Sequence, residues 1–349
     1  MKAIKFFAIS AMAAAMITSC SSEDELSQSN YPSDNIIRVT AGVNNAKTRA
    51  DVKYSPMDKP FSLTVVNKNN ANADLNAKYT YVNKVFAKVN DEWKCKDTLL
   101  WQKASLPVDI VALAPASDPA LPTAGNDNAI FDKIYESSDF HPLAYSVAKD
   151  QTTADDKNDL LYYYSKGFVP EDSLVNKKLN IKFNHAFCMI DIVVTLGTEF
   201  NKPNVLDDSP IVKVTLGGTK IEASVDVKNA ASVVTASGEA ADITTTKGSF
   251  TPAENADKKA DPEKNAISRF SCIAIPQTVA ANTFKVSLMT AGKRYEWTSD
   301  KEITLKSGYR YTLELSMGND VVLLKGGSDN GGITATPWGP GTGGSLETE

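Results

Sequence analysis

The sequence predicts an all-β protein made of about two β-sandwich domains. Short segments alternate apolar and polar residues with a period of two, as in Tyr309–Met317, and this alternation is typical of a strand with one buried face. Gly, Pro, Asn and Asp separate these segments, and neither a heptad repeat nor a long amphipathic helix interrupts them. The chain has 349 residues, 42% of them hydrophobic, so it is long and apolar enough to build proper cores.

Residues 1–19 are predicted to form a secretory signal peptide. Lys2 and Lys5 supply a positive start, and the apolar run that follows is shorter than the roughly 20 residues of a membrane-spanning helix. Cys20 comes directly after small residues, as in a bacterial lipoprotein signal. We therefore expect Cys20 to carry acyl chains such as palmitate, which anchor the chain in the membrane. The alternative is an ordinary signal peptide with an incidental cysteine.

The next segment predicts a tether and then the first strand. Residues 20–35 are polar and are expected to be a flexible tether. Residues 36–43 predict a strand with one buried face. The inward positions of that strand are Ile37, Val39, Ala41 and Val43. Residues 44–51 are polar and predict an exposed loop.

Further strands are expected from the same pattern. They cover residues 61–66, 79–89, 92–94, 108–114, 159–164, 178–183, 186–196, 211–216, 220–227, 270–275, 284–290, 294–298 and 309–317. The pair Gly217-Gly218 predicts a hairpin turn, and residues 228–265 predict weak strands and loops. The predicted N-terminal domain spans residues 36–180. The predicted C-terminal domain spans residues 181–349 and ends in a strand and tail at about residues 333–349.

Charge and cysteine content exclude several classes of function. The net charge of −5 argues against nucleic-acid binding, because no basic stripe is available to neutralise phosphates. Three cysteines remain after Cys20, namely Cys95, Cys188 and Cys272, and none lies in a CxxC pair. A disulfide scaffold and a zinc site are therefore both unexpected. Buried free thiols are the preferred interpretation of Cys188 and Cys272, with a bridge between them as the alternative.

No catalytic site is predicted. The chain has two histidines, His141 and His185, and neither lies near a GxSxG motif. For His185 we expect a partly buried ring bonded to a backbone carbonyl. The acidic residues are scattered, with no EF-hand spacing and no phosphate-binding loop, so we expect no metal, no cofactor and no enzymatic activity.

Four segments together resemble the fimbrillin family, the pilus (type V) subunits of the Bacteroidales. The first is Cys20–Glu25 with its tether, and the second is the early strand leading to Lys47-Thr48-Arg49-Ala50. The third is Asp159–Tyr164 followed by Ile181–Phe187, which is similar to the signature DLLYA…FxHxL. The fourth is Lys306–Leu315 with the C-terminal segment that begins at Ile333. Phe187 and Tyr164 depart from the usual residues, which changes packing more than role.

The resemblance implies two tandem transthyretin-like β-sandwich domains with Greek-key-type connections. It also implies a subunit of a surface fimbrium that supports cell adhesion and is held in the outer membrane by its lipid before processing. An Arg-specific protease would cut between Arg49 and Ala50 and so remove the first strand. Arg38 is a competing site, although it lies inside the predicted strand.

The other expected partners are pilus subunits, in a homo- or hetero-polymer. A donor strand from one subunit would enter the groove that the lost strand leaves open in another. The candidate donor is the C-terminal strand with Ile333 and Ala335, but Pro337 cannot donate to a ladder. The chain is therefore expected to be either a polymerising subunit or a tip or accessory subunit that accepts a strand and offers none.

A second hypothesis is a surface lipoprotein that does not polymerise and binds glycans. Exposed aromatic side chains stack on sugar rings. The four tryptophans are Trp93, Trp101, Trp297 and Trp338. This hypothesis requires at least two of them to line one exposed cleft.

Overall fold

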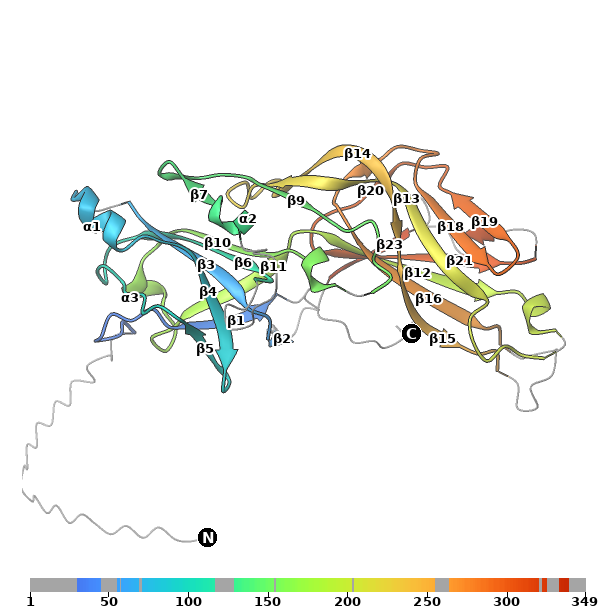
Figure 1. Cartoon of the computed structure of the whole chain (residues 1–349), viewed down its shortest axis with the longest axis horizontal. Coiled ribbons are helices and arrows are strands. Elements are labelled where there is room, and N and C mark those ends of the chain that lie inside the picture. The colour runs from blue at the N-terminus through green and yellow to red at the C-terminus, as the bar shows by residue number, and fades with distance from the viewer. Residues whose placement is uncertain are drawn as a thin grey trace, which may run out of the picture.

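The computed structural model describes residues 30–44, 55–56, 58–68, 71–116, 129–153, 155–202, 204–254, 264–319, 322–324 and 333–338. Strands dominate this part of the chain, which confirms the predicted all-β fold. Figure 1 shows an elongated molecule with one curled sheet at the N-terminal end and two packed sheets at the C-terminal end.

Eight strands form the first sheet, in the spatial order β2-β1-β11-β10-β6-β3-β4-β5. Their bounds are β1 Val39–Val43, β2 Ser55–Pro56, β3 Phe61–Asn67, β4 Tyr81–Val89, β5 Glu92–Cys95, β6 Val108–Ala114, β10 Leu161–Phe168 and β11 Leu179–His185. All neighbours are antiparallel except β1 and β11, which run parallel.

This sheet folds over on itself at one corner. β10 and β11 share only the pairs Leu161↔His185 and Tyr162↔Asn184, and then diverge. A single buried cluster contains side chains from β1 and β11 on one side of the corner and from β3, β4 and β6 on the other. The two halves of the sheet therefore face each other as the layers of a sandwich. Every residue of β3 is buried, including the polar Ser62, Thr64 and Asn67, because the strand is covered on both faces.

Two further sheets form the second sandwich. One has the order β15-β16-β12-β21-β22 with β23 also on β21, and the other has the order β14-β13-β18-β19 with β9 also on β13. The bounds are β9 Leu143–Ser146, β12 Cys188–Leu196, β13 Ile211–Val225, β14 Val234–Thr244, β15 Thr246–Thr251, β16 Ile267–Ala274, β18 Lys285–Thr290, β19 Arg294–Thr298, β21 Tyr309–Met317, β22 Val322–Leu324 and β23 Ile333–Pro337. Burial alternates strictly along β12 and β16, as the period-two pattern predicts.

Short elements complete the described chain. Two small ribbons pair β7 Tyr135–Glu136 with β8 Asp139–Phe140, and β17 Thr278–Val279 with β20 Ile303–Thr304. The helices are α1 Ala73–Lys78, α2 Ala129–Asp132 and α3 Pro170–Ser173, with 3-10 turns at Asp156–Asn158 and Thr198–Asn201. The Asn72 side chain caps α1 by accepting hydrogen bonds from the N–H groups of Asp74 and Leu75.

The predicted hairpin at Gly217-Gly218 is wrong. β13 runs through both glycines as one strand of 15 residues. Its pairing with β14 shifts register between Leu216 and Thr219, and Gly218 has a φ of +86°. The glycine pair therefore makes a β-bulge, which also requires a residue that tolerates positive φ. The weak strands expected after residue 228 include β14, which has 11 residues.

The two parts of the chain interlock. β9 comes from the first half of the sequence but pairs with β13 of the second sandwich, from Leu143↔Val225 to Ser146↔Glu222. Gln151 continues this attachment, because its side chain bonds both the N–H and the carbonyl of Ile273. The predicted boundary between residues 180 and 181 falls inside β11, so the first sheet continues to His185. The division into domains stays a prediction.

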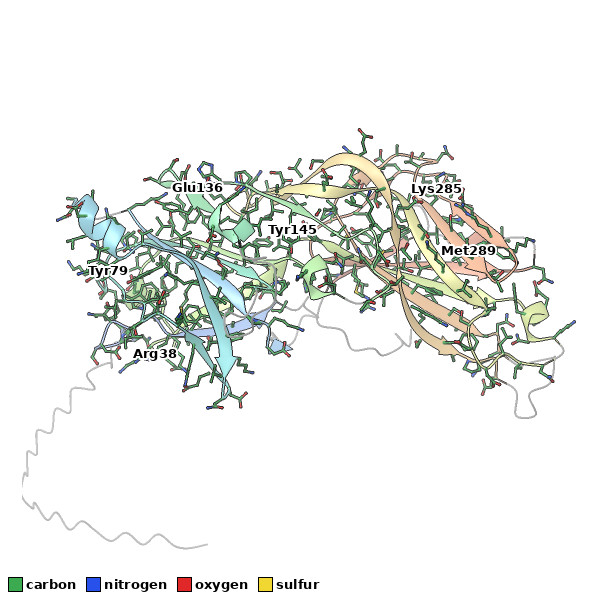
Figure 2. All side chains as sticks on the ribbon, in the orientation of Figure 1. Arg38, Tyr79, Glu136, Tyr145, Lys285 and Met289 are labelled. Carbon is green, nitrogen blue, oxygen red and sulfur yellow. The ribbon has the colours of Figure 1, made fainter. Side chains whose placement is uncertain are left out.

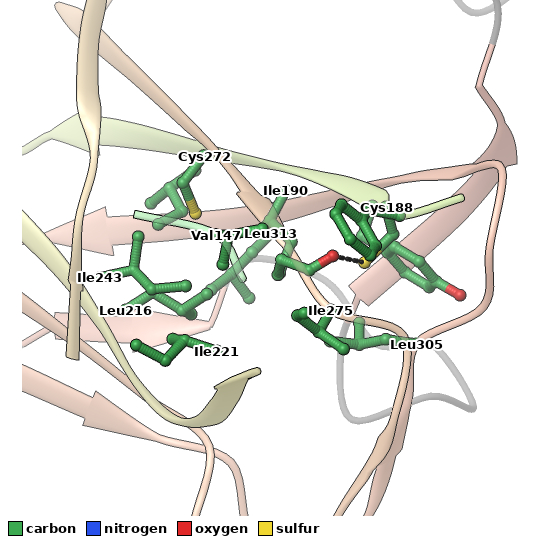
Figure 3. Close-up of a cluster of buried hydrophobic side chains, with 14 of the residues drawn as sticks. Val147, Cys188, Ile190, Leu216, Ile221, Ile243, Cys272, Ile275, Leu305 and Leu313 are labelled. Atoms are coloured by element: carbon green, nitrogen blue, oxygen red, sulfur yellow. Dashed lines mark hydrogen bonds between the residues drawn. The ribbon is translucent and has the colours of Figure 1, made fainter. Parts of the chain in front are cut away.

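The prediction of free cysteine thiols is confirmed for Cys188 and Cys272. Both are buried and unbridged in the core of the second sandwich. The Cys188 thiol donates a hydrogen bond to the carbonyl of Ala274, and Cys272 lies apart from it beyond Ile190 (Figure 3). Burial raises the pKa of both thiols, so both are inert in the folded chain.

Candidate functional site

The first strand, β1, lies near the edge of the first sheet. It pairs in parallel with β11, in the register Val39↔Leu179 to Val43↔Phe183. The Arg38 carbonyl accepts a hydrogen bond of 2.8 Å from the N–H of Leu179. At the other end the N–H of Asn44 donates to the Phe183 carbonyl over 2.7 Å. On the outer edge β2 pairs with β1 only at Gly42 and Val43.

The inward side chains of β1, together with Ile37 just before it, seal one side of the first core. The strand begins at Val39, later than the predicted start at residue 36. Ile37 and Val39 are each only 4% exposed, and Ala41 and Val43 are partly buried against the same cluster. Thr40 between them points to solvent, as the alternating pattern predicts. Phe61 forms the centre of the core, with ring centroids 5.5 Å from Phe86 and 5.5 Å from Phe183. The first strand therefore covers an apolar, largely aromatic floor.

An open groove runs beside β1. It has a volume of about 690 Å³ and lies between the segment Ile36–Ala41 and the strand β5 with its flanks. Trp93, Cys95 and Leu99 line the far side. We call it the β1 groove. It marks the place where the two edges of the curled sheet approach each other without pairing along β1 and β5.

The chain just before β1 is firmly held. The N–H of Ile37 donates to the Leu99 carbonyl, and the N–H of Trp101 donates to the Asn35 carbonyl. Arg38 makes a two-bonded ion pair with Asp34, at 2.9 and 2.5 Å (Figure 2 labels Arg38). The Arg38 guanidinium holds the pKa of the Asp34 carboxyl well below its usual range. With its backbone in the sheet and its side chain paired, Arg38 is a poor protease site.

The predicted lipidation and cleavage residues, Cys20, Arg49 and Ala50, lie outside the described residues. The described chain ends at Asn44 after β1 and resumes at Ser55 in β2.

The C-terminal strand, β23, occupies an edge of the second sandwich. It pairs antiparallel with β21, in the register Leu313↔Ile333 to Tyr309↔Pro337. Ile333 is 1% exposed and belongs to the second core, whereas Ala335 is exposed. The two predicted donor residues thus lie in a strand that is already part of a sheet of its own subunit.

His185 has a different partner from the one predicted. Its Nδ1 lies 2.8 Å from Oδ1 of Asp159, so a carboxylate takes the place of the expected backbone carbonyl. The reason is the pairing of Leu161, the first residue of β10, with His185, which brings Asp159, two residues before β10, next to the last residue of β11. His141 is exposed, with its Nε2 3.0 Å from the Glu136 carbonyl. The sequence signature contained both Asp159 and His185, but their contact was not predicted.

The tryptophans do not share a cleft. Trp101 and Trp338 are buried, at 2% and 8% exposure, and only Trp93 lines the β1 groove. Trp297 is partly buried and packs edge-on against Phe284 in the second sandwich. The glycan hypothesis required two of these indoles in one exposed cleft, so the described structure gives it no support.

The described ranges contain neither a metal site nor a membrane-spanning helix. There, no group of three or more His, Cys, Asp or Glu side chains is placed to hold a metal ion. Among the same residues, no helix is both long and apolar enough to cross a bilayer.

Comparison with known proteins gives the family. A model of the Fimbrillin-like family matches residues 48–338 of this chain. The chain therefore belongs to the fimbrillin-like family, and it is a structural protein of the pilus type rather than an enzyme. No curated protein matches it.

Solved structures show the same fold. A candidate cell adhesion protein from Bacteroides ovatus is 16% identical, with a TM-score of 0.55, over 86% of this chain and 95% of that chain. One from Bacteroides uniformis is 14% identical, with a TM-score of 0.51, over 88% and 99%. The tip fimbrial protein Mfa3 from Porphyromonas gingivalis is 11% identical, with a TM-score of 0.46, over 86% and 99%. The likeness of fold rests on the first two.

Proposed function

We propose that this chain is a pilus subunit whose first strand is cut away after Arg49 and replaced by a strand from another subunit. The observation that carries this proposal is the burial of Val39 in a strand at the rim of an aromatic core, with Ile37 buried just before that strand. Such a strand is held by the sheet, yet it has one neighbour along its full length and an open groove on the other side.

Loss of the first strand would leave the acceptor unstable. The backbone groups of β11 that bond β1 would lose their partners, and unpaired strand edges recruit other strands. Each restored ladder bond contributes about 1 kcal/mol. Burial of an isoleucine or valine side chain adds about 1.5–3 kcal/mol. A donor strand that supplies both kinds of contact joins subunits head to tail. Because head-to-tail contacts that do not close into a ring can repeat without end, they produce a filament.

The proposal includes export and anchoring. The signal peptide and Cys20 deliver the chain as a lipoprotein to the outer membrane, where an Arg-specific protease meets it. Cleavage between Arg49 and Ala50 separates the lipid anchor and β1 from the rest of the chain. The mature subunit then belongs to the fimbrium on the cell surface and supports adhesion there. In a polymerising subunit the donor is β23, with Ile333 and Ala335. A tip subunit would accept a strand from its neighbour and donate none.

Limited proteolysis of the purified chain tests the proposal. An Arg-specific protease is expected to cut first after Arg49, and the clipped protein is expected to form oligomers, detected by mass spectrometry and size-exclusion chromatography. The matched control is Arg38→Ala, which leaves Arg49 in place and should be cut normally, whereas Arg49→Ala should resist. A chain that is not cut after Arg49, or that is cut there and keeps β1 in place, would contradict the proposal. A chain that loses β1 and still remains monomeric would exclude a polymerising subunit.

A further inference from the structure

The C-terminal strand ends on an aromatic contact that joins the two halves of the molecule. The indole of Trp338 stacks on the imidazole of His185, with ring centroids 3.9 Å apart and planes inclined by 13°. His185 is the last residue of β11 in the first sheet, and Trp338 directly follows β23 of the second sandwich. Both side chains are 8% exposed, so the contact excludes water from both rings.

The His185 ring is held in place by Asp159. The carboxylate accepts from Nδ1 over 2.8 Å, so this nitrogen carries the proton. Nε2 is buried and has no hydrogen-bond partner among the described residues. Among the side-chain hydrogen bonds of the described residues, the one to Asp159 alone orients the ring. The imidazole can therefore act as a rigid platform of fixed orientation.

A glycine turn fixes the backbone of the tryptophan. Gly308, at φ +71°, accepts a hydrogen bond of 2.7 Å from the Trp338 N–H, and its own N–H donates to the Phe187 carbonyl over 2.9 Å. We call Asp159, His185 and Gly308 the indole seat. The seat holds Trp338 by its ring and by its backbone at the same time.

Burial along the C-terminal strand is concentrated at its two ends. Ile333 and Trp338 are buried, whereas Thr334, Ala335 and Pro337 between them are exposed. Pro337 has no N–H to donate to the ladder. The strand therefore depends on two apolar anchors, and the indole seat supplies one of them.

We infer that the indole seat is a binding site for the C-terminal tryptophan and that it retains β23 on its own subunit before assembly. This inference deepens the proposed function, on which its role in assembly rests: a strand that is to be donated must first leave the seat. The ligand class is an indole carried on an extended strand, and the occupant in the free subunit is the chain's own Trp338.

Amide hydrogen exchange of the uncleaved, monomeric chain tests the seat directly. Trp338→Ala is expected to speed exchange in β23 at least tenfold, while exchange in β12 stays within about twofold of the original. His185→Phe keeps a flat ring but loses the bond to Asp159, and it should give a smaller increase in the same strand. Trp297→Ala is the matched control, because it removes a partly buried indole elsewhere in the same sandwich.

The outcomes separate the seat from the proposed function. The inference is overturned if Trp338→Ala leaves the exchange rate in β23 unchanged. It is also overturned if the exchange rates in β12 and β23 rise equally. If Trp338→Ala does not fold, the same comparison is made with Trp338→Phe and His185→Phe, for which a severalfold rise confined to β23 is expected. After proteolytic clipping, Trp338→Ala should form oligomers faster than the original chain. If Trp338→Ala shows faster exchange in β23 but does not assemble faster, the inference that the seat retains β23 stands, and β23 is excluded as the donor.

Discussion

Gly218 shows how one residue shapes a strand. Its φ of +86° lets β13 bulge, and a Cβ added there would lie 2.1 Å from the Thr283 carbonyl oxygen. The Thr283 backbone cannot move away from such a contact as easily as a flexible side chain could. In addition, a residue with a Cβ at this positive φ would be strained by about 1–3 kcal/mol.

We therefore expect Gly218→Ala to lower the free energy of unfolding by about 2 kcal/mol or more. Gly292→Ala is the control, since a Cβ there meets nothing within 4 Å and should change stability by less than about 0.5 kcal/mol. Urea unfolding of both variants measures the difference. Equal stability of the two variants would show that β13 does not need the bulge.

Cys95 is a built-in reporter of the β1 groove. It lines the groove and is partly buried, and burial raises the pKa of its thiol. Because only the thiolate reacts with alkylating agents, labelling of the intact chain should reach half its maximal rate above the ordinary pH of about 8.5. Removal of β1 exposes the thiol, so the midpoint should fall towards the ordinary value, and a bound donor strand should raise it again.

This experiment uses a Cys20→Ser background, in which the remaining cysteines, Cys188 and Cys272, are buried and unreactive. Cys95→Ser should abolish labelling. A midpoint that is the same before and after removal of β1 would mean that the strand does not shield the groove.

At the scale of elements, β1 should contribute stability only while it is attached. Val39→Ala removes buried methyl groups and should lower the free energy of unfolding of the intact chain by about 2 kcal/mol. Thr40→Ala, on the exposed side of the same strand, should cost much less. After the chain has been clipped after Arg49 and has lost β1, both variants should have the same free energy of unfolding as the clipped original protein. A difference that persists after clipping would show that β1 stays bound.

The period-two pattern correctly predicted strands with one buried face. It did not predict irregular backbone such as a β-bulge. The inward residues of β1 and β21 follow from alternation alone. The bulge in β13 does not, because a glycine pair in a strand is compatible with both a hairpin and a bulge. The choice depends on whether one partner strand pairs with residues on both sides of the glycines, as β14 does, and local sequence does not encode that pairing.

At the scale of the whole molecule, the two sandwiches are tied together. β9 crosses from the first half of the chain to pair with β13, as Figure 1 shows. One buried cluster runs from the second core to Val66 and Leu113 on the outer face of the first sheet. The signature residues Asp159 and His185 add a third link through Trp338. The two sandwiches are therefore joined by a strand, by a continuous core and by an aromatic contact.

These long-range links could not be predicted from the sequence. β9 is a segment of four residues whose partner lies about 80 positions away, and short strands carry little signal of their own. The contact between Asp159 and His185 was within reach, because both belong to the signature, with Asp159 at the start of one predicted strand and His185 between the next two. The sequence did not predict the pairing that brings the end of β11 to the start of β10.

The most direct test of strand replacement is the identity of the N-terminal residue of the chain in pili isolated from the cell surface, determined by mass spectrometry. The account predicts that the assembled chain begins at Ala50 and lacks β1. An assembled chain that still begins at lipidated Cys20, with Ile37 and Val39 in place, would contradict it.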